Sequence, residues 1–170
     1  MDNRCSLLFQ KEGGEVVDSF SAWGIVCLKV PFDAGGKVKE LPKRDWSDED
    51  GYDVFVPSKL SFEGYESEFE LAYKGQELST SPFNLSLAFS RIDAFKKWLS
   101  GHDSSSPSAS LSIYSPYSGI GRRDCYLSSI SDESPHLQLK GENGNVYNET
   151  VVTFKVKFWV NDPVTNIVLG

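Results

Sequence analysis

The chain has 170 residues, of which 39% are hydrophobic and 24% are charged, a composition typical of a globular protein and unlike that of a disordered one. This length predicts a single domain over residues 1–170, large enough to bury a core without disulfides or metals. The net charge of −7 argues against a protein that wraps nucleic acid, because affinity for the duplex comes largely from Lys and Arg on phosphates. A surface that nucleic acid passes without binding remains compatible with this charge.

The sequence carries no signal for export or membrane insertion. The first ten residues hold only a short apolar run, and no stretch approaches the roughly 20 apolar residues of a membrane-spanning helix. Cys5, Cys27 and Cys125 are widely spaced, which argues against a secreted disulfide framework and indicates synthesis in a reducing compartment. Each cysteine is expected to be a small buried side chain.

Alternation of apolar and polar residues predicts strands through most of the first half. Residues 5–9 fit a strand, and residues 22–30 fit one covered on both faces, because both of its registers are apolar. Residues 54–62 alternate, and the pattern resumes over residues 65–73. Gly64 between them predicts a bulge or a tight turn, giving either one long bent strand or a hairpin.

A polar stretch over residues 33–53 interrupts these strands. At about twenty residues it exceeds the usual length of a loop, which favours a functional projection. Aspartates gather around Trp46 in its second half, but without the spacing of a calcium-binding EF-hand loop. We expect a solvated, partner-facing acidic loop, with Trp46, Asp48 and Asp50 as candidate residues of a subunit interface.

The second half predicts one helix among further strands. Ile92, Phe95 and Leu99 recur at three- and four-residue steps, so a helix is expected over about residues 90–100, and Gly101 is a suitable terminator. Strands are expected over residues 111–114, 122–130, 136–140, 150–160 and 165–169. Alternate valines and phenylalanines from Val152 to Val160 make the strand over 150–160 the most strongly indicated, and it is expected in the centre of the sheet.

These elements predict a mainly β fold with one helix (α+β). An antiparallel β-sandwich and a partly closed β-barrel, each flanked by a single α-helix, both fit the element order.

No catalytic motif emerges from the residue patterns. His102 and His136 lack the spacing of metal ligands, and no nucleophile–base signature is present. Gly119 and Gly121 are followed by a strand rather than a helix, which indicates a hairpin tip and not a phosphate-binding loop. We therefore expect no enzyme activity, no catalytic or cofactor-binding residues, no metal, no cofactor and no small-molecule substrate.

Two surface patterns remain as functional candidates. Trp159 projects from the polar face of the strand over 150–160, where it is either covered by its own chain or part of a subunit interface. Glu66, Glu68 and Glu70 share one face of the strand over 65–73. They either pair across strands, with lysines of the 150–160 strand or Lys59, or they line a channel that DNA passes.

The order of elements over residues 54–169 carries a resemblance to a known family. The helix ends in Trp98-Leu-Ser-Gly101, and the next strand and turn contain Ile113-Tyr-Ser-Pro-Tyr and Gly119-Ile-Gly-Arg-Arg. Cys125-Tyr-Leu-Ser-Ser-Ile follows, and the last long strand and the turn after it cover Val151 to Pro163. This order resembles the tail-tube and distal-tail proteins of long-tailed bacteriophages and prophages. In that family a β-sandwich flanked by one helix forms rings, usually hexameric, around the DNA channel, and there is no catalytic motif.

The resemblance implies a non-enzymatic structural subunit of a phage or prophage tail, either tube or distal-tail ring. Its partners would be further copies of itself, in a ring, and other tail proteins, with DNA only as passing cargo and no membrane. It would be made in the bacterial cytoplasm and carried in the virion tail.

The alternative function is a carbohydrate- or peptide-binding β-sandwich. In that case Trp46, Tyr114, Tyr117 and Trp159 would form a stacking platform. Self-assembly at high concentration would favour the tail subunit, whereas glycan binding by a monomer would favour the binding module.

Overall fold

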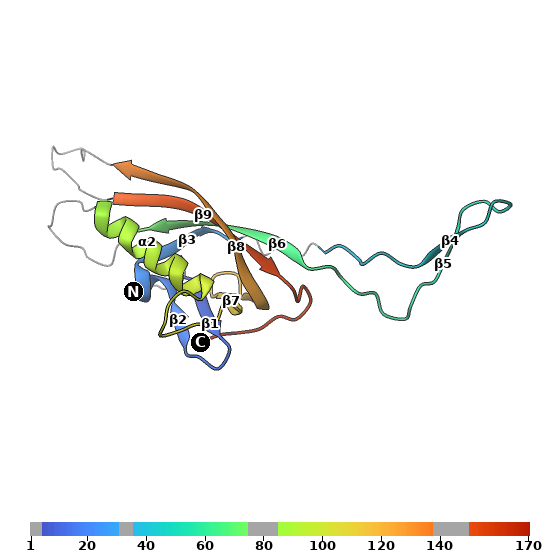
Figure 1. Cartoon of the computed structure of the whole chain (residues 1–170), viewed down its shortest axis with the longest axis horizontal. Helices are drawn as coiled ribbons and strands as arrows, with labels where there is room; N and C mark the ends of the chain where they lie inside the picture. The colour runs from blue at the N-terminus through green and yellow to red at the C-terminus, as the bar shows by residue number, and fades with distance from the viewer. Residues whose placement is uncertain (1–4, 31–35, 75–84, 138–149) are drawn as a thin grey trace.

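The computed structural model describes residues 5–30, 36–74, 85–137 and 150–170 (Figure 1). These residues form one 7-stranded antiparallel sheet in the order β2-β1-β7-β8-β9-β6-β3, a separate β4-β5 ribbon, and two helices. The bounds are β1 Leu8–Lys11, β2 Val16–Asp18, α1 Ser19–Trp23, β3 Ile25–Lys29, β4 Lys43–Asp45, β5 Tyr52–Val54, β6 Tyr65–Tyr73, α2 Leu85–Ser100, β7 Leu111–Ser115, β8 Ile120–Leu137 and β9 Thr150–Val160. The predicted mainly β, antiparallel fold is confirmed, and the sheet is not a closed barrel.

Strand β9 lies inside the sheet, between β8 and β6, as predicted. Nine consecutive residue pairs join it to β6, from Tyr65 opposite Val160 to Tyr73 opposite Val152. Its alternate valines and phenylalanines from Val152 to Val160 are at most 2% exposed. The period-two pattern therefore gave the buried face correctly, because successive side chains of a strand point to opposite faces of the sheet.

Helix α2 covers the inner face of the sheet (Figure 1). It buries Ala88, Ile92, Phe95 and Leu99, and the Phe95 ring lies 6.3 Å from that of Phe154 between centroids. The helix begins at Leu85, five residues before the predicted start.

The end of α2 is where the sequence placed it. Gly101 adopts a left-handed conformation with a φ of 80°. The His102 amide donates to the Lys97 carbonyl at 3.0 Å, and the Gly101 amide donates to that of Trp98. This pair of hydrogen bonds is a Schellman motif, which satisfies carbonyls that the last helical turn leaves without partners.

The predicted strand over residues 22–30 is divided. Its first part belongs to the five-residue helix α1, a second helix that the sequence analysis did not predict. Asp18 caps α1 by accepting from the amides of Phe20 and Ser21, and Gly24 ends it with a φ of 70°. The centroids of the Trp23 and Trp98 rings lie 5.3 Å apart. Trp23 is therefore apolar because it is buried on a helix and not because it lies in a strand.

Ser19 of α1 links the two ends of the open sheet. Its hydroxyl accepts from the Leu7 amide at 3.0 Å and donates to the Ile25 carbonyl at 2.9 Å, and its own amide donates to the Leu7 carbonyl. Leu7 precedes β1 and Ile25 begins β3. One buried side chain thus takes the place of the strand ladder that would have closed a barrel.

The carboxyl-terminal elements differ from expectation in two places. Strand β8 is one long strand with bulges at 127–129 and 131–134, where two strands were predicted; residues 138–140 lie outside the described residues. Residues 165–169 are not a strand but cross the turn end of β8 at Gly121. A Cβ at Gly121 would lie 2.3 Å from the Ile167 carbonyl oxygen, so only glycine allows this crossing.

The predicted sheet strand over residues 54–62 was wrong. Only Tyr52–Val54 is a strand, β5, and it pairs with β4 and not with the large sheet. Residues 36–63 instead form a long arm that extends away from the body, with β4 and β5 near its far end (Figure 1). The projection predicted at 33–53 is therefore present in its described part, and it continues ten residues further than expected, to residue 63.

Candidate assembly surfaces

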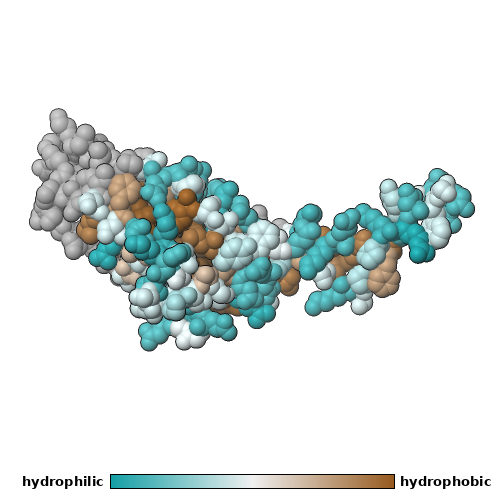
Figure 2. Space-filling view, viewed as in Figure 1, coloured by the Kyte–Doolittle hydropathy of each residue, from teal (hydrophilic) through white to brown (hydrophobic). Residues whose placement is uncertain are grey.

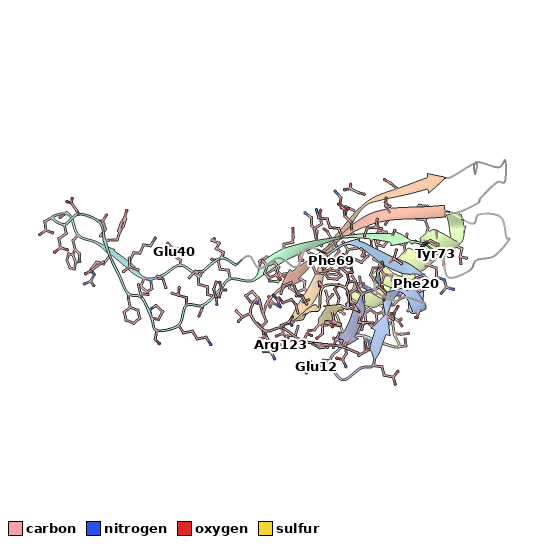
Figure 3. All side chains as sticks on the ribbon, turned by 180° about the vertical axis from the view of Figure 1, so that it is seen from behind. Glu12, Phe20, Glu40, Phe69, Tyr73 and Arg123 are labelled. Carbon is pink, nitrogen blue, oxygen red and sulfur yellow. The ribbon has the colours of Figure 1, made fainter. Side chains whose placement is uncertain are left out.

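The arm consists of two antiparallel limbs and a tip. We call residues 36–45 the outgoing limb, 46–51 the tip and 52–63 the return limb. Near the body, the Lys39 amide donates to the Ser61 carbonyl at 2.8 Å and the Glu63 amide to that of Lys37 at 2.7 Å. The Lys37 ammonium also lies 3.1 Å from the Glu63 carboxylate. Backbone hydrogen bonds and surface charges hold the arm, and Figure 3 shows it, with Glu40 on its outgoing limb, clear of the packed body.

The return limb exposes large apolar side chains. Tyr52 is 66% exposed, Phe55 69% and Val56 64%, and each of Val54, Leu60 and Phe62 is more than a third exposed. Figure 2 shows apolar surface along the arm on the body side of its hydrophilic tip. An isolated two-stranded ribbon has no second layer in which to bury such residues. These side chains were missed as site residues, because their alternation reads as a buried sheet face.

The tip carries three of the predicted interface residues. Trp46 is 43% exposed, and Asp48 and Asp50 lie beside it on the exposed turn. The Arg44 guanidinium lies 4.9 Å from the centre of the Trp46 ring, a cation–π contact of the arm with itself. The structure thus brings Trp46, Asp48 and Asp50 together at the far end of the arm.

Trp159, the fourth predicted interface residue, lies where the arm meets the body. A Cβ at Gly64 would stand 3.1 Å from its ring, so the ring packs over the residue that leads the return limb into β6. The indole Nε1 donates to Asn161 Oδ1 at 2.7 Å. Trp159 is half-buried by its own chain, and it lies at the opposite end of the arm from Trp46.

Glu66, Glu68 and Glu70 lie on the outer face of β6, opposite Trp159, Lys157 and Lys155 of β9. The Lys157 ammonium lies 3.3 Å from the Glu66 carboxylate and 3.9 Å from that of Glu68. Glu66 also accepts from the Ser128 hydroxyl at 3.1 Å. This part of the sheet therefore presents mixed rather than purely negative charge, as cross-strand pairing predicts.

The segment after β9 is fastened by Asp162. Burial raises the pKa of its carboxyl, but hydrogen bonds from the Thr165 amide, the Arg123 guanidinium and the Val164 amide outweigh burial, and the pKa falls well below its usual range. The Arg123 Nε lies 2.8 Å from the carboxylate. Figure 3 shows Arg123 on the body. This cluster holds the carboxyl-terminal segment and carries no ligand chemistry of its own.

The cysteines do not all match the expectation of burial. Cys125 is buried as predicted, and burial raises the pKa of its thiol to about 12. Cys27 is half-buried, and Cys5 is exposed, so the prediction was wrong for Cys5.

The described residues hold neither a cluster of metal ligands nor a membrane-spanning helix. Within these ranges, no three His, Cys, Asp or Glu side chains gather where they could hold a metal ion. No helix in the same residues combines the length and apolar character needed to span a membrane.

Comparison with known proteins gives a likeness of fold. No family model matches the chain, and no curated protein matches its sequence. Among solved structures, the chain is similar to SPP1 Dit (gp 19.1), described as a paradigm of the hub adsorption apparatus in phages that infect Gram-positive bacteria. The match has a TM-score of 0.53 at 14% sequence identity and covers 92% of this chain. The two proteins share a fold. The chain spans 50% of the length of SPP1 Dit, so it corresponds to about half of that protein.

Proposed function

We propose that this chain is a non-enzymatic structural subunit of a phage or prophage tail. It acts as one domain that assembles with copies of itself into a ring, hexameric by the family resemblance, and joins other tail proteins of the tube or distal-tail region. DNA passes through the ring as cargo, and the assembled chain resides in the virion tail after synthesis in the bacterial cytoplasm. The fold shared with SPP1 Dit supports this proposal.

The observation that carries the proposal is the exposed apolar return limb. Phe55 and Val56 are each more than 60% exposed on an arm that cannot bury them itself. Apolar surface gains roughly 25 cal/mol per Å² when it leaves water, so covering these side chains against a neighbouring subunit would stabilise an assembly. The arm is the docking element, and its occupant is the next subunit of the ring.

Arm deletion tests the assembly role. Residues 37–62 are replaced by a short Gly-Ser linker, and solution mass is measured over a concentration series, followed by negative-stain electron microscopy. The unaltered chain is expected to form rings as concentration rises, while the deleted chain stays folded and monomeric. Rings formed without the arm would refute its role, and an unaltered chain that stays monomeric at every concentration would refute the tail-subunit proposal.

Paired point variants locate the contact on the arm. Phe55→Ser with Val56→Ser removes apolar surface from the return limb, and Asp48→Asn with Asp50→Asn removes charge from the tip. The return-limb pair is expected to abolish ring formation, whereas the tip pair shifts its salt dependence, because exposed charges contribute little net affinity. Trp46→Ala measures the aromatic contribution of the tip. Equal losses for both pairs would contradict the leading role of the return limb.

The channel role of Glu66, Glu68 and Glu70 is a separate proposal. Their outer face would line the passage for DNA, where carboxylates repel phosphates weakly and leave them free to slide. Replacing all three with Gln is expected to leave ring formation intact and to add salt-sensitive binding of duplex DNA, measured by gel shift on assembled rings. Unchanged DNA binding would refute the channel role, and the ion pairs with Lys157 would then be the function of this face.

The stacking platform of a carbohydrate- or peptide-binding module has less support. Trp46 lies at the far end of the arm, and the ring of Trp159 packs over Gly64 at its root. These aromatic side chains therefore do not share one surface, which leaves the exposed return limb as the stronger candidate for binding.

A further inference from the structure

The segment before β1 and the start of β3 meet at the open edge of the sheet. The Ser19 hydroxyl bonds both the Leu7 amide and the Ile25 carbonyl, which brings these two backbone segments to the same side chain. Cys5 lies two residues before Leu7, and Cys27 lies two residues after Ile25. A pair of cysteines therefore flanks the contact that Ser19 makes between these two segments.

Strand direction places these cysteines on the same side of Ser19. The pairings β1–β7, β7–β8, β8–β9, β9–β6 and β6–β3 are all antiparallel, and an odd number of reversals makes β1 and β3 run in opposite directions. The chain that precedes Leu7 and the chain that follows Ile25 therefore extend from Ser19 in the same direction. Each step spans two residues, so Cys5 and Cys27 lie on the same side of Ser19.

The two thiols differ in their access to solvent. Cys5 is exposed, whereas Cys27 is half-buried with its Sγ 3.3 Å from the Lys29 carbonyl oxygen. Burial raises the pKa of the Cys27 thiol to about 12, with a smaller contribution from the negative charge of the Cys5 thiolate. Cys5 is therefore the thiol that a dissolved oxidant reaches first.

We propose that Cys5 and Cys27 form an intramolecular disulfide under oxidising conditions and so fasten the amino-terminal segment to β3. A disulfide needs the two Cα atoms within about 7 Å, and Cys5 lies outside β1, where no ladder of hydrogen bonds restrains its approach. The free thiols of the present structure are the reduced form.

The bond forms by exchange with a small disulfide such as oxidised glutathione. The Cys5 thiolate attacks one sulfur of glutathione disulfide, giving a mixed disulfide and releasing a glutathione thiolate. The Cys27 thiolate then attacks the Cys5 sulfur, forming the protein disulfide and releasing the second glutathione. Two protein thiols are oxidised, one glutathione disulfide is reduced, and the two thiol protons pass to the released glutathione and solvent. Because little Cys27 is ionised at neutral pH, the second step is slow and quickens with rising pH.

The setting of this reaction rests on the proposed function, whereas the bond itself does not. A chain made in the reducing cytoplasm and carried in a released virion would move from conditions that keep thiols free to conditions in which disulfides persist. The disulfide would then lock the body after assembly is complete. A failure to oxidise leaves the ring proposal intact, and a failure to form rings leaves the disulfide testable in the monomer.

Peptide mapping of the full chain tests the bond. The protein is incubated with a glutathione redox buffer at pH 8.5, alkylated and digested with trypsin without reduction. Cleavage after Arg4, Lys11 and Lys29 places Cys5 and Cys27 in separate peptides, 5–11 and 12–29. The expected product is these two peptides linked, with the count of free thiols falling from three to one and Cys125 still free. The melting temperature should rise by roughly 5–10 °C, as expected for closing a loop of this size in a chain of this length.

Matched variants separate this bond from other oxidation. Cys5→Ser and Cys27→Ser should each abolish the linked peptide and the rise in melting temperature, while Cys125→Ala should retain both. The rate of linkage should increase about tenfold per pH unit while Cys27 remains largely protonated. Glutathione that stays on Cys5, a Cys5–Cys5 dimer on non-reducing gels, or a linked product without a change in melting temperature would overturn the proposal.

Discussion

The body and the arm both contain alternating apolar residues, but these residues are buried in the body and exposed on the arm. In the body, alternate apolar residues of β9 and β6 face α2 and are almost fully buried. On the return limb, the alternate residues Val54, Val56, Leu60 and Phe62 are each more than a third exposed. A period-two pattern therefore specifies which side chains share a face, and the presence of a second layer decides whether that face is covered. In the proposed ring, a neighbouring subunit would supply the layer that the arm lacks.

Truncating one phenylalanine in each region gives the sharpest form of this comparison. Phe154 is 2% exposed and packs against Phe95, so Phe154→Ala should lower the free energy of unfolding by about 3–5 kcal/mol. Phe55→Ala on the arm should change it by less than about 0.5 kcal/mol in the monomer. Urea denaturation of both variants measures the difference, and similar losses would show that the arm belongs to the core.

Removing the Ser19 hydroxyl tests the closure of the body. Ser19→Ala leaves the Leu7 amide and the Ile25 carbonyl without the partner that joins them, which should cost about 1–3 kcal/mol. Ser110→Ala, at an exposed position, is the matched control and should stay within about 0.5 kcal/mol. Denaturation by urea measures both, and a neutral Ser19→Ala would mean that water or rearranged backbone replaces the bridge.

Acid should weaken the body through Asp162. The pKa of Asp162 is lower in the folded chain than in the unfolded one, where it is about 3.9. Its stabilisation is therefore present above that value and lost as pH falls below it toward the folded pKa. Asp162→Asn should lower stability by about 1 kcal/mol at pH 7. The gap between the two proteins should close below about pH 3.9 in denaturation experiments over a pH series. A gap independent of pH would exclude the carboxylate charge as its cause.

The smallest effect is expected on the outer face of the sheet. Replacing Glu66, Glu68 and Glu70 with Gln removes the ion pairs with Lys157, but it also relieves repulsion among three carboxylates. Because all these groups are at least partly in water, the net change should be a few tenths of a kcal/mol. The tip pair Asp48→Asn with Asp50→Asn is the control on the arm, and thermal denaturation compares them. A loss above about 1 kcal/mol would mean that the stripe is part of a stronger network.

Several parts of the body could be read from the sequence because the information is local. Ile92, Phe95 and Leu99 have helical spacing, and Gly101 supplies the left-handed conformation that ends α2. The valines and phenylalanines of β9 define a buried face by alternation alone. Periodicity and capping act within one element, so they survive without knowledge of the rest of the fold.

The candidate site was only partly accessible in this way. Trp46, Asp48 and Asp50 stand out as an aromatic residue in an acidic stretch, and the structure places them on an exposed tip. The return limb was missed, although apolar residues alternate there directly after a polar loop, at Val54, Val56, Leu60 and Phe62. The same alternation describes a strand with one buried face, so the sequence could not separate an exposed arm from a strand of the sheet.

The sequence by itself determined that the chain is mainly β, where α2 ends, and which face of β9 is buried. Only the tertiary structure decided that residues 54–62 lie outside the large sheet and that Trp23 ends a helix. It also decided that Ser19 and Gly121 are contact points between distant segments. The physical reason is that alternation and helical spacing arise from the geometry of one element, whereas burial and close approach depend on which other segment arrives. Leu7 and Ile25 meet only because the Ser19 hydroxyl of α1 bonds both of them.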